Sequence, residues 1–225
     1  MSLYDKINHI YFINLEKSTD RKKHIVNNLK TYFPDKKIIR FDAVDSEDIK
    51  KYFLSYIKRL NMINSKTMYN VFGCYFSHLC LLKYLSLTNK NNDTFSLIFE
   101  DDSEIDLNFI NLLKQNSKFP DDFNVILGVQ LKKNKLKNNI TYVKNNYKYL
   151  LNKIDDDIKP YIYGTGIVVY NNNKLNYIYN KLLENIINKS YKEIDMCFIY
   201  YIQNVYFFNI NLLISNKYTK NSTIY

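Results

Sequence analysis

The sequence has no tryptophan, and only four glycines and three prolines among its 225 residues. So little glycine and proline argues against a collagen-like, linker-rich or low-complexity chain. Apolar residues make up 46% of the chain and aromatic residues 16%. That content is enough for a substantial core, so the chain is expected to fold rather than stay disordered. Its length fits one domain spanning residues 1–225.

Paired cysteines are also missing. Cys74, Cys80 and Cys197 form no C-x-x-C pair and are odd in number, which argues against a disulfide scaffold and a structural zinc site. A signal peptide is not evident either, because residues 1–6 are polar and the apolar run 9–15 is too short. We therefore expect a reducing, cytoplasmic location.

A long apolar stretch covers residues 196–215, but four amide side chains interrupt it: Gln203, Asn204, Asn209 and Asn211. Each of these amides would be costly in hydrocarbon. A buried helix followed by a strand is therefore favoured over a membrane span.

Acidic residues are outnumbered, and the formal net charge is +10. The lysines are scattered along the whole chain together with asparagine, which indicates a general residue-usage bias rather than a basic footprint on one element. Nucleic acid is therefore not expected as a partner. A nucleotide diphosphate can account for the surplus, and so can an anionic lipid surface with peripheral membrane association.

Short segments rich in β-forming residues alternate with segments of helical periodicity. Strands are expected at 9–14, 37–41, 95–99, 123–127, 163–170 and 205–215, and helices at 20–32, from 46, at 72–87, 107–114 and 175–187. This alternation predicts an α/β protein with a mostly parallel sheet and helices on both faces. The polar, lysine- and asparagine-rich residues 132–157 are expected to form a mobile loop region.

An acidic cluster, Glu100-Asp101-Asp102, directly follows the apolar strand 95–99. Ligands bind beyond the carboxyl ends of strands in such sheets. If the backbone stays extended, Glu100 and Asp102 point to the same side and Asp101 to the other. A hard divalent cation, Mg²⁺ or Mn²⁺, would relieve the repulsion among adjacent carboxylates. The alternative is an acidic turn that caps the next helix.

A second acidic run, Asp155-Asp156-Asp157, has no apolar strand before it. It lies between lysine-rich sequence and Pro160. A solvated loop is therefore its expected structure.

Several short motifs follow one another along the chain. In order they are Ile13-Asn14-Leu15 with Asp20-Arg21, residues 40–45 (RFDAVD), 73–78 (GCYFSH), 97–102 (LIFEDD), 123–128 (FNVILG), Gly164-Thr165-Gly166 and Ile194-Asp195. In this order and approximate spacing the chain resembles the family 25 glycosyltransferases, which include bacterial lipooligosaccharide galactosyltransferases and procollagen galactosyltransferases. Each motif alone is weak, but the series spans nearly the whole chain.

The resemblance implies a GT-A type fold, which is Rossmann-like, and inversion at the anomeric carbon. It implies a UDP-sugar donor, most often UDP-galactose, with UDP-glucose less favoured. The cofactor predicted from the carboxylate cluster is Mn²⁺ or Mg²⁺. The acceptor would be a hydroxyl group on a glycan, a lipooligosaccharide or a hydroxylysine-type protein. A catalytically silent glycosyltransferase-like binding domain is the alternative. The oligomeric state is left open.

Residue roles follow from the same resemblance. Asn14, Leu15 and Arg21 would flank the nucleotide, and Asp42-Ala43-Val44-Asp45 would form part of the base and ribose pocket. Asp102 would lead in binding the metal, and Glu100 and Asp101 would assist it or contact ribose and sugar hydroxyls. No histidine follows His78, so few protein ligands would hold the metal.

The remaining motif residues carry two interpretations each. Ser77 and His78 would lie at the donor side of their helix, but His78 also fits an apolar stripe as a core histidine. Gly164 and Thr165 would shape the floor under the donor sugar or acceptor, or simply bend a strand. Asp195 is the candidate catalytic base, because inversion needs a group that deprotonates the acceptor hydroxyl. Its alternative is a helix N-terminal residue favoured by the dipole.

Overall fold

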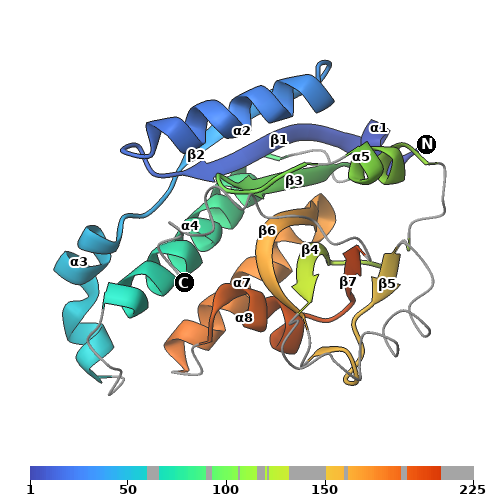
Figure 1. The fold of residues 1–225 in the computed structure, drawn as a ribbon. Helices are drawn as coiled ribbons and strands as arrows, with labels where there is room; N and C mark the ends of the chain where they lie inside the picture. Colours follow the sequence, from blue (N-terminus) through green and yellow to red (C-terminus); the bar gives the residue numbers. More distant parts are fainter. Residues whose placement is uncertain are drawn as a thin grey trace.

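The computed structural model describes residues 1–59, 66–89, 93–105, 107–115, 120, 122–131, 151–159, 162–188 and 192–208. A seven-stranded sheet forms the centre of this part of the chain (Figure 1). Its strands are β1 (Ile7–Asn14), β2 (Lys37–Asp42), β3 (Phe95–Glu100), β4 (Val125–Leu131), β5 (Leu151–Lys153), β6 (Ile162–Asn171) and β7 (Val205–Phe208). Their order across the sheet is β2-β1-β3-β6-β4-β7-β5.

Strand directions are mixed. β1 runs parallel to β2 and β3, and β4 runs parallel to β7. β6 is antiparallel to both β3 and β4, and β5 is antiparallel to β7. Five strands, β1, β2, β3, β4 and β7, therefore run in one direction, which agrees with the prediction of a mostly parallel sheet, but three of the six pairings are antiparallel, so the sheet is mixed. A continuous apolar run such as Ile167–Tyr170 indicates burial on both faces, which is typical of parallel strands, but it does not encode direction.

Helices cover both faces of the sheet, as predicted (Figure 1). One face packs against α1 (Leu3–Lys6), α2 (Thr19–Tyr32) and α5 (Leu107–Lys114). The other packs against α4 (Lys66–Thr88), α7 (Leu175–Ile187) and α8 (Ile194–Tyr201). A short 3₁₀ helix, η3 (Asn172–Lys174), joins β6 to α7, and α3 (Ser46–Arg59) packs on α4. The predicted α/β class is confirmed.

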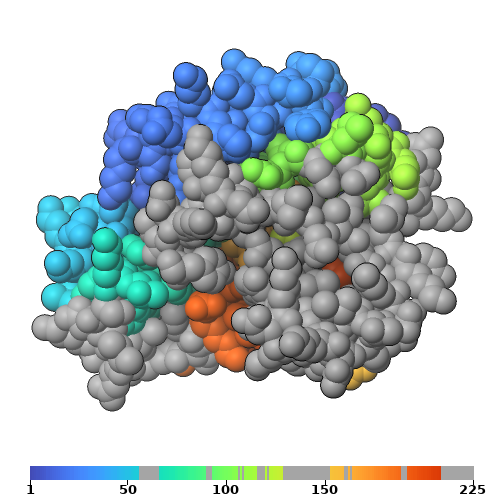
Figure 2. All heavy atoms as spheres, viewed as in Figure 1, coloured from blue at the N-terminus to red at the C-terminus, as the bar shows by residue number. Residues whose placement is uncertain are grey.

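The central strand β6 separates the two halves of the core. Ile167 and Val169 pack under α2 and α5, whereas Val168 and Tyr170 pack under α4, α7 and α8. Successive residues of a strand point to opposite faces, so an unbroken apolar run fits a strand that is buried on both. In the all-atom view the N-terminal segments, with α2, form one side of the molecule, and α3 and α4 lie below them (Figure 2).

Several details differ from the sequence-based prediction. Helix α4 begins six residues before the predicted start at residue 72, and α1 and β5 were not predicted. β5 lies within residues 132–157, which were expected to be loop, and 132–150 lie outside the described residues. The predicted helix followed by a strand in 196–215 is confirmed as far as Phe208. Among the described residues, no helix combines the length and apolarity needed to cross a membrane.

Candidate active site

A cavity of about 580 Å³ lies where the carboxyl ends of β1, β2 and β3 meet α4. Parallel neighbours end at the same edge of a sheet, so the segments that follow these strands converge there. The predicted residues among those that line the cavity are Asn14, Leu15, Arg21, Ala43, Val44, Ser77, His78, Glu100, Asp101 and Asp102. The structure therefore brings these predicted residues together at one edge of the sheet.

Asn14, the last residue of β1, ties three segments together. Its side-chain Nδ2 donates to Asp101 Oδ2 at 2.7 Å and to the Ser18 carbonyl at 3.1 Å, and its Oδ1 accepts from Arg40 Nε at 3.0 Å. The side chain is buried, so each of these polar atoms needs its partner. Asn14 thus fixes the acidic cluster against the turn before α2.

The acidic cluster leaves the strand at Glu100, because residues 101–102 form a turn. The backbone is therefore not extended here, and the prediction that Glu100 and Asp102 point to the same side does not hold. Instead, Arg21 Nη1 lies 3.1 Å from Asp101 Oδ1 and 3.6 Å from Asp102 Oδ2. Asp101 and Asp102 thus share one guanidinium while Glu100 faces α4.

The negative charges of Asp101 and Asp102 are only partly balanced by nearby positive charge. Burial raises the pKa of Asp102 to about 7, helped by the charges of Glu100 and Asp101 and opposed by Arg21. Burial also raises the pKa of Asp101, although hydrogen bonds from Asn14 and Arg21 act against it. Desolvation disfavours the charged form of a carboxyl, and a nearby like charge adds to the effect. The cluster holds negative charge that one arginine does not balance.

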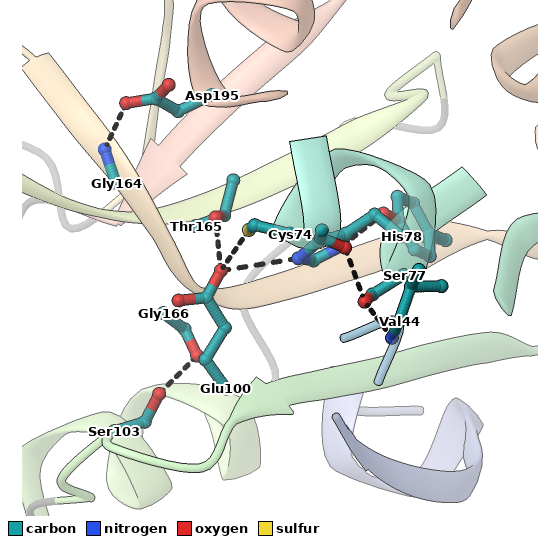
Figure 3. Close-up of polar contacts among 12 residues, drawn as sticks. Val44, Cys74, Ser77, His78, Glu100, Ser103, Gly164, Thr165, Gly166 and Asp195 are labelled. Carbon is teal, nitrogen blue, oxygen red and sulfur yellow. Dashed lines mark hydrogen bonds and ion pairs between the residues drawn. The ribbon is translucent and has the colours of Figure 1, made fainter. Parts of the chain in front are cut away.

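Glu100 has a different environment (Figure 3). Its Oε1 lies 2.5 Å from Thr165 Oγ1, 3.3 Å from His78 Nε2 and 3.7 Å from Cys74 Sγ. Burial would raise its pKa, but the hydrogen bond and charge of His78, with the bonds from Thr165 and Cys74, lower it overall. Glu100 is therefore held as a carboxylate.

Cys74, His78 and Glu100 bring one potential ligand atom each to within 4.8 Å of one another. This cysteine, histidine and carboxylate group could hold a metal ion. Burial, with the charges of Glu100 and Asp195, raises the pKa of the Cys74 thiol well above its usual value, so the thiol keeps its proton unless a cation displaces it. The other ring nitrogen of His78, Nδ1, lies 3.3 Å from the Tyr170 hydroxyl. The fully buried His78 is thus a core residue with polar partners that also lines the cavity.

Ser77 fastens α4 to the cavity wall. Its hydroxyl donates to the Gly73 carbonyl at 2.6 Å and accepts from the Val44 amide at 2.8 Å (Figure 3). A Cβ at Gly73 would lie 2.8 Å from the Val44 carbonyl oxygen, closer than side chains allow. Glycine at this position therefore lets α4 pack directly against the wall formed by Ala43 and Val44.

Asp42 and Asp45 lie outside the residues that line the cavity. The Asp42 carboxylate is 77% exposed and pairs with Arg40 Nη2 at 2.6 Å. Asp45 pairs with Lys17 at 2.5 Å and accepts from the Glu47 amide at 3.1 Å, at the start of α3. Asp45 therefore braces the rim between two loops.

Gly164, Thr165 and Asp195 also lie outside the cavity lining, beyond Glu100 (Figure 3). The buried Asp195 carboxylate accepts from the Gly164 amide at 2.7 Å and from the Met196 amide at 2.8 Å. It stands in the first turn of α8, where an acidic residue is favoured. Gly164 has a φ of +95°, which favours glycine and bends β6. Of these three residues, Thr165 contacts the cavity-lining Glu100 directly.

Some lining residues were not predicted. Lys17, Lys66 and Asn70 also line the cavity, and the Lys17 ammonium pairs with Asp45 at its rim. Lys17 could have been found, because it follows the motif that ends β1. Tyr170 carried no distinguishing pattern, since it is one tyrosine in an apolar strand. Cys74 was recognised as part of a motif, but no role was assigned to it.

The chain belongs to glycosyltransferase family 25. The family model described as "Glycosyltransferase family 25 (LPS biosynthesis protein)" matches residues 7–206. No curated protein sequence matches the chain. The suspected family is confirmed, and the chain is a glycosyltransferase. Its sheet has helices on both faces, as the predicted GT-A type fold requires.

Two solved structures are similar to the chain. One is a crystal structure of the galactosyltransferase LgtC in complex with donor and acceptor sugar analogs. It is 12% identical, with a TM-score of 0.48, and the match covers 88% of this chain and 72% of that one. The other is mouse xyloside xylosyltransferase 1 in its apo form, 10% identical, with a TM-score of 0.41 and coverage of 88% and 68%.

Proposed function

We propose that the protein transfers a hexose, galactose, from UDP-galactose to a hydroxyl acceptor, with inversion and with Mn²⁺ or Mg²⁺ bound. The observation that carries this proposal is the acidic cluster at the cavity edge, where the half-buried Asp102 lies beside two other carboxylates. Family membership supports transfer of a sugar. UDP-glucose is the competing donor.

The cavity suits a nucleotide diphosphate. Lys17, Arg21 and Lys66 supply positive charge, and residues 18–20, at the start of α2, also line it. A helix N-terminus presents unpaired amides to an anion. Asn14, Leu15, Ala43 and Val44 would contact the nucleotide, with Asp42 and Asp45 near the base and ribose. Ser77 would support this wall from behind.

The acidic cluster fits a hard cation. Its donor set is carboxylate oxygen. The raised pKa of Asp102 reflects burial first and then repulsion from Glu100 and Asp101, and a divalent ion would relieve that repulsion. Asp102 would be the first ligand and Glu100 the second, with Asp101 held in place by Asn14 and Arg21. When bound, the cation would neutralise charge on the departing diphosphate.

Asp195 is proposed as the base. It accepts the proton of the acceptor hydroxyl while the acceptor oxygen bonds to the anomeric carbon. The bond from that carbon to the diphosphate oxygen breaks, and UDP leaves with the electron pair. The charge of Asp195 raises the pKa of the cavity-lining Cys74, so this carboxylate lies within electrostatic reach of the site. A carboxylate has about four acceptor positions, and two backbone amides occupy two of them.

The acceptor is proposed to be a hydroxyl group on a glycan, a lipooligosaccharide or a hydroxylysine-type protein, bound by one catalytic domain spanning residues 1–225. The surplus of basic residues would suit peripheral association with an anionic membrane that presents such an acceptor. Cytoplasmic location remains our prediction.

The direct test is release of UDP from UDP-galactose by the purified chain with Mn²⁺. Turnover is expected with UDP-galactose, at a lower rate with UDP-glucose, and is expected to stop when EDTA is added. Equal turnover with and without EDTA would contradict the proposed dependence on a metal ion. No UDP release with either sugar, together with no calorimetric binding of UDP, would contradict the proposed donor.

A further inference from the structure

Strand β6 carries a bulge beside the acidic cluster. In the pairing of β4 with β6, Gly128 faces Ile167 and Gln130 faces Tyr163. One residue thus separates the partners on β4, whereas three, residues 164–166, separate them on β6. A bulge re-aims a side chain and is common beside active sites.

Contacts at both ends fix this bulge. At its start, the Gly164 amide donates to Asp195 at 2.7 Å, with the φ of +95° that glycine tolerates. At its end, the Ser103 hydroxyl donates to the Gly166 carbonyl (Figure 3). A Cβ at Gly166 would come within 3.2 Å of the Ser103 oxygen, so the small residue allows this approach. The middle residue, Thr165, is thereby held in one place.

Thr165 points at Glu100 rather than at the cavity. Its side chain is buried, and it is absent from the cavity lining, whereas Glu100 lines the cavity. The hydroxyl donates to Glu100 Oε1 at 2.5 Å. Hydrogen bonds to a charged acceptor are shorter and stronger than neutral ones.

The other donors approach the same oxygen from α4. His78 Nε2 and Cys74 Sγ both point to Glu100 Oε1, and the Tyr170 hydroxyl meets His78 on its far side (Figure 3). Thr165, His78 and Cys74 thus all contact Glu100 Oε1. Within the described part of the chain no hydrogen bond reaches Oε2, so this oxygen is available to the cavity that Glu100 lines.

We propose that Thr165, presented by the bulge, is a positioning residue that acts on sugar transfer through Glu100 and does not touch the donor. It holds Glu100 Oε1 together with His78, so that Oε2 is directed to the cation or donor sugar. This inference rests on the proposed function. It replaces the direct donor contact expected for Thr165 and His78 with an indirect one.

The first experiment compares Thr165→Val, Thr165→Ser and wild type in UDP release from UDP-galactose. Valine keeps the shape and removes the hydroxyl, so kcat is expected to fall about 10- to 100-fold, as for the loss of a hydrogen bond to a charged group. The donor KM is expected to stay within about twofold, because a group that does not touch the donor adds no ground-state binding. Thr165→Ser should restore most of the rate.

A matched control is Ser96→Ala, which removes a buried hydroxyl from β3 that bonds Asn172 and Asn89 rather than the acidic cluster. Its kcat is expected to equal that of wild type. An unchanged kcat in Thr165→Val would overturn the inference, and so would a raised donor KM with unchanged kcat. No turnover in wild type would instead overturn the proposed function, so the two failures are distinct.

A double-mutant cycle tests the contact without relying on activity. Urea unfolding is measured for Thr165→Val, Glu100→Gln and the double variant. The two substitutions are expected to couple, with a deviation from additivity of about tenfold in the unfolding equilibrium constant. Strict additivity would show that Thr165 does not act through Glu100, and would contradict the inference even if Thr165→Val lowers kcat.

Discussion

The chain contains two runs of three carboxylates, and the structure treats them in opposite ways. Glu100, Asp101 and Asp102 lie at the end of the buried strand β3, and all three line the cavity. Residues 155–157 are exposed: the Asp155 side chain accepts from the Ile158 amide at 3.0 Å, and Asp156 pairs with Lys159 at 2.7 Å. The solvated structure predicted for the second run is confirmed. The segment that precedes each run thus decides whether its carboxylates are shielded or exposed to solvent.

The two acidic runs also differ in their electrostatic surroundings. The pKa of Asp102 is raised to about 7 because burial and two neighbouring carboxylates oppose its charge. Solvent screens the charge of Asp156, whose side chain is 92% exposed. A run of acids is therefore a candidate cation site only where the fold shields it from water. The predictions below test this contrast.

The largest effect is expected from Asp102→Ala. Loss of a cation that stabilises developing charge is worth several kcal/mol, so UDP release should fall about a thousandfold or more. Asp156→Ala is the matched control in the second run, and its rate should equal that of wild type. Calorimetry should show Mn²⁺ binding to the control only. Equal rates of UDP release in Asp102→Ala and Asp156→Ala would contradict a special role for the first acidic run.

Asp195→Asn tests a buried carboxylate that lies outside both acidic runs. The amide oxygen can still accept from Gly164, so the bulge is retained while the base is lost. General base catalysis typically contributes a factor of 100 or more, so kcat should fall about 100- to 1000-fold with little change in UDP affinity. Steady-state kinetics and UDP titration measure both. A variant with near-normal kcat would leave Asp195 as a helix N-terminal residue only.

Asp102→Asn is expected to stabilise the protein at pH 8 in EDTA. The pKa of Asp102 is higher in the folded state, about 7, than its ordinary value of 3.8. The folded state therefore binds the proton more tightly, and the resulting stability, full below pH 4, is lost as pH rises through 7. After allowance for relaxation, the variant should gain about 1–2 kcal/mol at pH 8 and almost nothing at pH 4. Urea unfolding at both pH values measures this, and a less stable variant at pH 8 would contradict the buried charge.

The smallest effect is expected from Asp156→Ala on stability. Its ion pair with Lys159 is exposed to solvent, and such pairs contribute below about 0.5 kcal/mol. The urea midpoint should match that of wild type at pH 8 and at pH 4. A clear shift at pH 8 would show that the second run is more than a solvated turn.

Much of the fold was predictable because periodicity reports burial. β3, α5 and α7 match their predicted ranges to within a residue. The cavity edge was also predictable, since residues that end parallel strands must meet. Asn14 and Glu100 lie there for that reason.

Strand direction and side-chain direction were not predictable. The apolar run 167–170 reads the same whether β6 runs up or down. The turn at residues 101–102 reverses the expectation that Asp102 points with Glu100, because local sequence does not show where pairing stops. The bulge at 164–166 depends on contacts with Asp195 and Ser103, which are distant in sequence.

The antiparallel course of β6 constrains how the chain can change in length. The site uses the residues where β3 leaves the sheet and those where β6 enters it, and Phe99 opposite Ile167 sets the register between them. Deleting residue 168 or 169 would exchange the faces of the residues that follow in β6 and put Tyr170 into the wrong half of the core. Insertions and deletions should therefore be tolerated in surface connections but excluded from this strand.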